Sequence, residues 1–170
     1  MSLFRTIFPG PWPLLGVVHL APLPGSPRHS LSMKEIAGRA EADAEALAAA
    51  GFDGVLVENF GDQPFHPDDV EPHTVAAMAL LVARVLTVVR RTRPDGPPPV
   101  GVNVLRNDAR AALAIAATTG ARFVRVNVHT GAMVTDQGLL QGKAHETLRY
   151  RCALGAEVAI LADVLVKHAQ

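Results

Sequence analysis

The chain has 170 residues, carries 16 basic and 16 acidic side chains, and is 49% hydrophobic. This balance is typical of a globular protein with a sizeable core, and it lacks the excess of lysine and arginine that nucleic acids and anionic membranes attract. We therefore expect one domain over residues 1–170 that binds no nucleic acid.

Cysteine content and apolar runs indicate the compartment. Cys152 is the single cysteine, so it cannot form an internal disulfide. The longest apolar stretch, Val75 to Val89, is interrupted by Arg84 and is shorter than the ~20 apolar residues of a membrane span. The N-terminus shows no signal-peptide pattern. We expect a cytoplasmic protein without a transmembrane helix.

The first elements are predicted from apolar runs and capping patterns. Residues 1–13 form a lead-in that contains proline and glycine. The apolar run from Leu14 to Leu20 predicts a strand buried on both faces. Ser32 begins a Ser-x-x-Glu capping box, so a helix is expected from there to Gly51. A second strand follows at 54–58.

The same alternation continues to the end of the chain. Apolar residues at steps of three and four between Val75 and Val89 predict a helix with Thr74 as its N-cap. The remaining predicted elements are a strand at 100–105, a helix capped by Asn107 or Asp108 and ending at Thr119, a strand at 123–128, a helix at 142–154 and a strand at 158–164. Five strands and four helices are thus expected to alternate.

The joints between helices and strands favour one architecture. Gly51, Gly120 and Gly155 each precede an apolar strand, which is typical of a parallel sheet. Right-handed crossovers leave an open doubly wound sheet or a (β/α)8 barrel, and the first strand-to-helix turn lacks the G-x-G-x-x-G fingerprint of the former. We therefore predict an α/β fold of the TIM-barrel type.

The chain is short for a complete barrel, which takes about 250 residues. About five strands and four helices of such a barrel are accounted for. Three explanations stay open: the chain is part of a longer protein, it closes its sheet as a homo-oligomer, or the sheet is open after all.

Polar residues gather where the predicted strands end, which is the functional edge of both architectures. In chain order the candidates are His19, Glu58, Asn59, Asp62, Asn103, Arg106, Asn107, Asp108, Arg125, Asn127, His129, Thr135, Asp136, Gln137, Asp163, Lys167 and His168. Helix capping and turn formation explain Asp62, Asn107 and Asp108 without any function.

Arg125 and Asn127 are harder to explain as turn residues. They alternate with valines inside a predicted strand, so both side chains lie on one face. A charged group on an inward face needs a partner or a ligand. Two alternatives remain open: Arg125 pairs with Glu58 or Asp163, or it recognises an anion.

Some of these residues are of types that support metal binding or Schiff-base chemistry. His19, Glu58, His129 and Asp163 are residue types that ligate metals, but none belongs to a short chelating motif, so no metal site is predicted and the cofactor is left unknown. Lys167 could form a Schiff base if it were desolvated, although a solvated lysine is the simpler interpretation.

Seven sequence blocks coincide with the predicted strand ends and loops. They are Gly16–Pro27, Val57–Phe65, Thr74–Met78, Gly101–Asp108, Arg125–Gly131, Thr135–Gly138 and Ala162–Ala169. In this order they resemble the BtpA/SgcQ family from about Leu14 to Ala169. The resemblance implies a TIM-barrel protein of the ribulose-phosphate-binding type whose members continue past the last block.

The resemblance also implies two kinds of function. The family is named after a cyanobacterial factor for photosystem I accumulation that lies on the cytoplasmic face of the thylakoid, and other members belong to gene clusters for sugar metabolism. One hypothesis is therefore a protein that binds or converts a small ligand such as a phosphorylated sugar. The alternative is a non-enzymatic photosystem I biogenesis factor that acts by protein contact at the thylakoid surface of a photosynthetic host.

The first hypothesis assigns roles to the residues at the strand ends. Glu58 is the acid/base candidate, and Arg125 and Lys167 would hold anionic groups. The side chains that would orient the ligand are those of His19, Asn59, Asn103, Asn127 and Asp163. The candidate catalytic residues are Glu58, Asp163 and Lys167, and the candidate ligand-binding residues are His19, Asn59, Asn103, Arg106, Arg125, Asn127, His129, Asp136 and His168. Whether the protein is an enzyme stays open.

Overall fold

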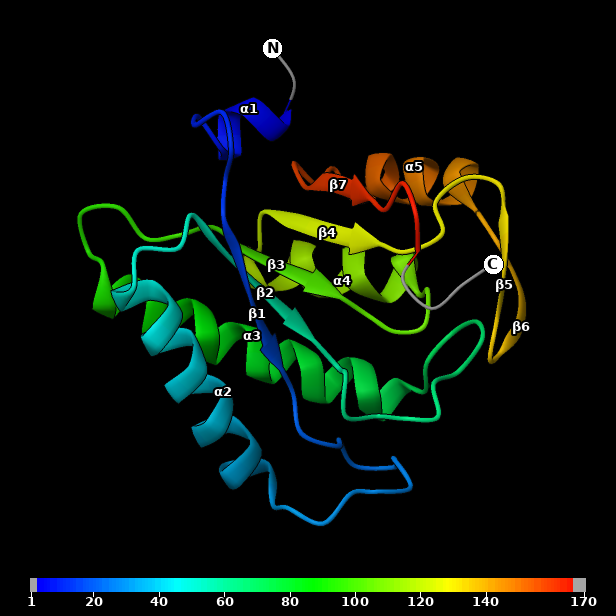
Figure 1. The fold of residues 1–170 in the computed structure, drawn as a ribbon, viewed down its shortest axis with the longest axis horizontal. Coiled ribbons are helices and arrows are strands. Elements are labelled where there is room, and N and C mark those ends of the chain that lie inside the picture. The colour runs from blue at the N-terminus through cyan, green and yellow to red at the C-terminus, as the bar shows by residue number, and fades with distance from the viewer. Residues whose placement is uncertain (1–2, 167–170) are drawn as a thin grey trace.

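A computed structural model describes residues 3–166 and shows a five-stranded parallel sheet (Figure 1). The strands are β1 (Leu15–His19), β2 (Gly54–Glu58), β3 (Val100–Asn103), β4 (Phe123–Val126) and β7 (Ala159–Ala162). Their order in space is their order in the chain, and every neighbouring pair is parallel. A doubly wound sheet reverses its order, whereas this sequential order is that of a partial (β/α) barrel. The expected fold class is confirmed.

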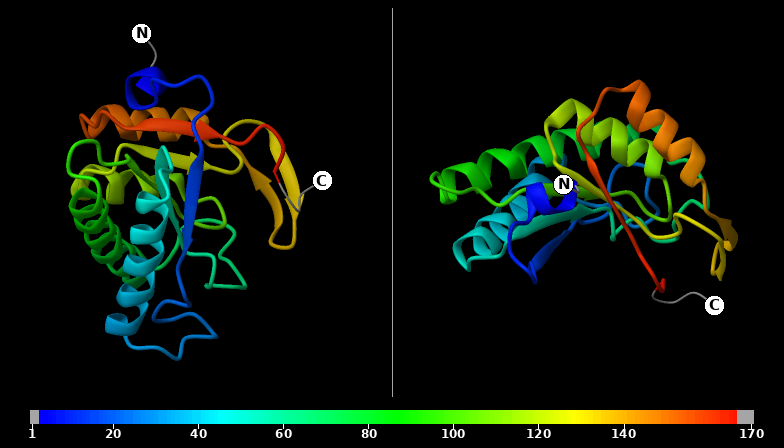
Figure 2. Two further views of the ribbon diagram at one scale, coloured as in Figure 1. Left: turned by 60° about the vertical axis from the view of Figure 1, so that its left-hand side comes forward. Right: turned by 90° about the horizontal axis from the view of Figure 1, so that it is seen from above.

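Four helices connect these strands and form one layer. They are α2 (Met33–Ala49), α3 (Pro72–Thr92), α4 (Ala109–Thr119) and α5 (Ala144–Ala153). Each helix packs against the next one along the chain, and α2, α3 and α4 also contact the strands beside them. The helices therefore cover one face of the sheet, as the view from above shows (Figure 2). We call the opposite face the inner face.

Local sequence explains where these helices begin and end. The hydroxyl of Ser32 accepts a hydrogen bond from the backbone of Glu35, whose carboxylate accepts one from the Ser32 backbone, so the predicted capping box is present. Helix α4 ends at its C-cap Gly120, which has a φ of 87°, a left-handed conformation that costs glycine little. Asp108 is the N-cap of α4.

Helix α3 begins earlier than expected. Its N-cap is Glu71 and its first residue is Pro72, so the prediction of Thr74 as N-cap was wrong. Proline suits this position because the first helical N–H groups have no partner within the helix. Thr74 instead lies buried within the first turn.

The composition of α3 would also suit a membrane span. Within residues 3–166 it is the one helix that is long and apolar enough, judged by length and composition, and half of its apolar window is buried in the protein. Its Arg84 donates a 2.6 Å hydrogen bond to Glu41 of α2. A helix that packs its apolar stripe against α2, α4 and β3 has the composition of a core helix.

Two apolar layers cover the two faces of the sheet. The main core lies between sheet and helices and includes Val18, Val55, Val57, Val102, Val124, Met78, Leu81 and Leu113. On the inner face, Phe8, Leu56, Phe123 and Ala159 form a smaller cluster, against which α1 (Leu3–Ile7) packs. The lead-in over residues 1–13 thus contains a helix that the sequence did not predict.

A hairpin between β4 and α5 was also not predicted. It consists of β5 (Ala132–Thr135) and β6 (Gly138–Gln141), which pair antiparallel around Asp136 and Gln137. Its strands have only four residues each and are mostly exposed, so they carry no long alternating pattern.

Three strands of the sheet end two residues earlier than expected, at Asn103, Val126 and Ala162, and β1 ends one residue earlier, at His19. Side chains replace the ladder beyond two of these points. Leu105 N–H donates to Asn59 Oδ1 at 2.7 Å, and Val128 N–H donates to Asn107 Oδ1 at 2.8 Å. Strands β1 and β7 form the two edges, so the sheet does not close on itself within the described residues.

Candidate functional site

The inner face carries polar residues at the carboxyl end of every strand of the sheet. Because side chains alternate between faces, parallel register brings these residues to one level. His19 is paired in register with Glu58, and Glu58 with Asn103. Arg125 lies in β4, and Asp163 follows β7 directly. Apolar residues of the same face lie below them, toward α1.

Glu58 is at the centre of this group, with only 6% of its side chain exposed. Its Oε2 atom accepts hydrogen bonds from Asn103 Nδ2 at 2.6 Å and from Arg125 Nη1 at 3.3 Å. Its Oε1 atom lies 3.5 Å from Nε2 of His19. One carboxylate oxygen is therefore held by the scaffold, while the other faces an imidazole.

His19 lies at the open end of this group. Its side chain is 54% exposed, and its ring stacks on Phe60 with 4.5 Å between the ring centroids. The stacking and the nearby Glu58 fix the ring from two sides. His19 is thus an oriented imidazole that a ligand can reach.

Arg125 is bound by two carboxylates. Its Nε and Nη2 atoms donate to the two oxygens of Asp163, both at 2.9 Å, and Nη1 donates to Glu58. The hydrogen bonding of Arg125 to Asp163 is the main cause that raises the pKa of Arg125. Asn127 also donates to Asp163, at 3.0 Å. Of the two alternatives left open by the sequence, the structure shows the ion pair.

Several candidate residues hold loops in place. Asn59 bonds the backbone of Leu105, Asp62 accepts from the Leu23 N–H at 2.7 Å, and Asn107 joins the backbone of Val128. Burial raises the pKa of Asp62. Asp108 caps α4 through its hydrogen bond from Ala111 N–H and also accepts from Val70 N–H at 2.9 Å. Asp108 is thus a cap residue, as expected, whereas the side chains of Asp62 and Asn107 connect segments that are distant in the chain.

Some buried polar atoms have no hydrogen-bond partner among the described residues. They are Ser26 Oγ, Arg106 Nε, Asn127 Oδ1, His129 Nδ1 and Gln137 Oε1. All belong to strand ends or loops at the carboxyl edge of the sheet. Since buried polar atoms in folded proteins are nearly always hydrogen-bonded, this edge offers unused partners to a ligand or to water.

The last observations on the candidate residues concern metal binding, the charges around Arg125, and the residues near the end of the chain. Within residues 3–166 no three histidine, cysteine, aspartate or glutamate side chains come together as a metal site. Arg125 contacts both Glu58 and Asp163 and holds their charges. Burial lowers the pKa of His129, which follows β4. Lys167 and His168 lie outside the described residues.

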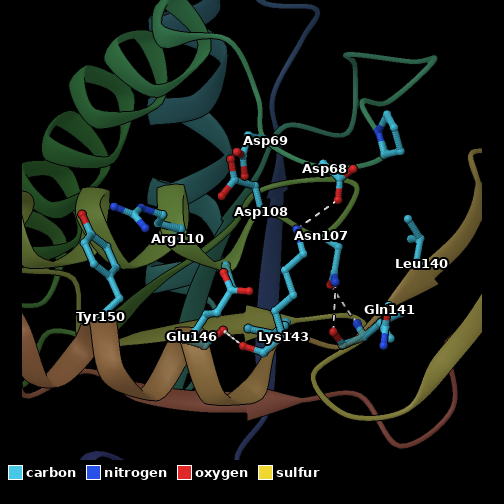
Figure 3. A pocket seen from close by; sticks show the side chains of 15 residues that line it. Asp68, Asp69, Asn107, Asp108, Arg110, Leu140, Gln141, Lys143, Glu146 and Tyr150 are labelled. Atoms are coloured by element: carbon cyan, nitrogen blue, oxygen red, sulfur yellow. Dashed lines mark hydrogen bonds and ion pairs between the residues drawn. The ribbon is translucent and has the colours of Figure 1, made fainter.

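A pocket of about 190 Å³ that the sequence did not predict lies on the helix side of β4 (Figure 3). It lies between the loop after β2, the start of α4, and α5. Its charged side chains include Asp68, Arg110, Lys143 and Glu146. Lys143 donates to Asp68 at 3.1 Å, and the Arg110 guanidinium lies over the ring of Tyr150 at 4.5 Å. The pocket is lined by four segments that are distant in sequence, 67–69, 107–110, 126–128 and 140–150, so no local pattern identifies it.

A parallel, sequentially ordered sheet with a polar cluster at its carboxyl edge defines the class: a partial β/α barrel with a candidate ligand site at the mouth. Comparison with known proteins specifies the family. A model of the BtpA family matches residues 11–170, and the chain belongs to this family. The resemblance inferred from the seven blocks is confirmed. No solved structure matches the chain.

Relatives come from distant organisms. The chain is 55% identical, over all of its 170 residues, to the Photosystem I biogenesis protein BtpA of Synechocystis, of which it covers 56%. It is 44% identical to an uncharacterized protein of Pyrococcus abyssi, with 94% of the chain and 59% of that protein aligned. An uncharacterized mitochondrial protein of Caenorhabditis elegans is 35% identical, over 91% of the chain and 56% of that protein. The chain thus spans somewhat more than half the length of these relatives.

Proposed function

We propose that this BtpA-family chain binds a small polyhydroxylated ligand, a sugar or sugar phosphate, at the carboxyl ends of its strands. The observation that carries the proposal is the connected cluster around Glu58, to which every strand of the sheet contributes at its carboxyl end. Barrel proteins bind their ligands at this edge. Fixed carboxylate and amide groups supply the paired donors and acceptors that hydroxyl groups require.

The contact between Glu58 and His19 supports proton transfer at this site. Nε2 of His19 faces the carboxylate, which leaves Nδ1 of the exposed ring for a ligand. A carboxylate beside one ring nitrogen determines which nitrogen carries the proton, and an oriented imidazole is a common general acid or base. His19 would exchange the proton with the ligand, Glu58 would orient His19, and Arg125 and Asp163 would keep Glu58 in position.

A binding screen with matched variants tests this proposal. Sugars and sugar phosphates are titrated into the chain by calorimetry, and each ligand found is measured again with Glu58→Gln and His19→Asn. We expect both substitutions to weaken binding at least about tenfold, which corresponds to ~1.4 kcal/mol. Glu157→Gln is the control, because Glu157 is exposed and precedes β7 at the opposite edge. Failure of every compound, or equal affinity in Glu58→Gln, would refute the proposal.

A second function is favoured by the 55% identity to the Synechocystis protein, whose name assigns it to photosystem I biogenesis. Such a factor would act by protein contact. Relatives in archaea and in a nematode, which have no photosystem I, support a more general activity for the family.

Genetic complementation separates the two functions. A photosynthetic host that lacks its own family member is given this protein with or without Glu58→Gln. A protein that acts through the ligand site would lose photosystem I accumulation with this substitution. A contact factor would restore photosystem I, because Glu58 is buried and offers no surface to a partner.

A further inference from the structure

Arg106 lies in the loop after β3, three residues past Asn103, and has only 10% of its side chain exposed. Its guanidinium makes no hydrogen bond to any described residue, and its Nε atom is buried without a partner. Its contact with a carboxylate is long, 4.0 Å from Nη2 to Oδ1 of Asp136. A guanidinium carries five N–H donors, and leaving them unpaired in a buried place costs free energy.

The two arginines at this edge differ in one respect. Arg125 is matched by two carboxylates, so an anion that approached it would have to replace Asp163 or Glu58. Among the described residues, the one carboxylate within 4.0 Å of the Arg106 guanidinium is that of Asp136, whose side chain is 68% exposed in the hairpin turn, so solvent screens their attraction. The cation available to a ligand is Arg106.

The backbone on both sides of Arg106 is fixed by hydrogen bonds. Asn59 holds Leu105, Asn107 holds the end of β4, and the Arg106 N–H donates to the His66 carbonyl at 3.2 Å. The Arg106 guanidinium also lies 5.8 Å from the ring centre of Phe65, a cation–π distance. The guanidinium is thus held before any ligand arrives, which lowers the entropy lost on binding.

We propose that Arg106 binds the phosphate group of a phosphate-monoester ligand, with the Asp136 carboxylate occupying this side of the guanidinium until the phosphate displaces it. The planar guanidinium matches two phosphate oxygens at once. Other unpartnered polar atoms lie on the neighbouring β4 end and hairpin, at Asn127, His129 and Gln137, where they can meet the rest of the ligand. This inference deepens the proposed function. It rests on the proposed function only for the part of the ligand that is not the phosphate group.

Inorganic phosphate is the probe that tests Arg106 separately from the sugar site. It is titrated into the ¹⁵N-labelled chain while the arginine Nε–H resonances are followed by NMR. We expect one saturable shift, which is absent in Arg106→Gln, and phosphate affinity at least about tenfold weaker in Arg106→Lys, since lysine keeps the charge and loses the planar group. Arg149→Gln, an exposed arginine in α5, is the control and should bind as the unmodified chain does.

Asp136→Asn should change the phosphate affinity in the opposite direction. Removing the competing carboxylate should strengthen phosphate binding several-fold, whereas a purely structural Arg106–Asp136 contact would leave phosphate affinity unchanged in every variant. Circular dichroism shows whether each variant folds. Equal phosphate binding in folded Arg106→Lys, or equal loss in Arg149→Gln, would overturn the inference. Glu58→Gln should retain phosphate binding, so failure of the sugar screen and failure of the Arg106 site are distinguishable.

Discussion

Replacing Arg125 by methionine should destabilise the sheet measurably. Methionine is of similar length but removes the two 2.9 Å hydrogen bonds to Asp163 and the 3.3 Å hydrogen bond to Glu58. Removing one partner of a fully buried ion pair costs about 3–5 kcal/mol. The Arg125 side chain is 33% exposed, so water screens part of this loss, and we expect about 2–3 kcal/mol. For a chain of this size that lowers the melting temperature by about 5–10 °C.

A double-mutant cycle measures whether the loss belongs to the ion pair. Urea unfolding is followed by circular dichroism for Arg125→Met, Asp163→Leu and the double variant, with Arg149→Met as a control for a lost surface arginine. The double variant removes the Asp163 charge that Arg125→Met leaves unpaired, while Glu58 keeps its hydrogen bond from Asn103. It should therefore be more stable than the sum of the single losses predicts, by more than about 1 kcal/mol. Additive losses, or a change below about 0.5 kcal/mol in Arg125→Met, would refute the reasoning.

Three further predictions concern packing, pH and capping. Gly101→Ala should cost about 1–3 kcal/mol in urea unfolding, because an added methyl group overlaps the buried ring of Phe123; Phe123→Leu in the same chain should recover part of it. Burial lowers the pKa of His129, so the stability that its neutral form contributes is complete above about pH 6.5 and is lost as the pH falls. Between about pH 7.5 and about pH 5.5 the melting temperature of His129→Gln should therefore fall less than that of the unmodified chain. An identical fall in both proteins would contradict this. Ser32→Ala should destabilise the chain by about 1 kcal/mol in thermal unfolding, whereas Ser30→Ala, two residues earlier and exposed, should change little.

Local signals in the sequence were sufficient for the helices and strands of the sheet. The capping box at Ser32, the glycine at the end of α4 and the valine-rich runs each act within a few residues, so they are readable without a fold. Thr74 shows the limit of local signals, because Pro72 is also a favourable first residue of a helix and the helix begins there instead. The hairpin and α1 were missed because each is short and depends on contacts with the rest of the protein.

Alternation along β4 also placed Arg125 and Asn127 on one face, and parallel order placed the polar strand ends together. What the sequence by itself determined is therefore the fold class, the family and the edge of the sheet that carries the site. It could not determine which side chains pair, because Arg125 is 67 residues from Glu58 and 38 from Asp163. Only the tertiary structure showed that Arg125 is neutralised by these carboxylates, while the buried Nε atom of Arg106 has no hydrogen-bond partner among the described residues. A hydrogen-bond partner is decided by position in space and not by position in the chain.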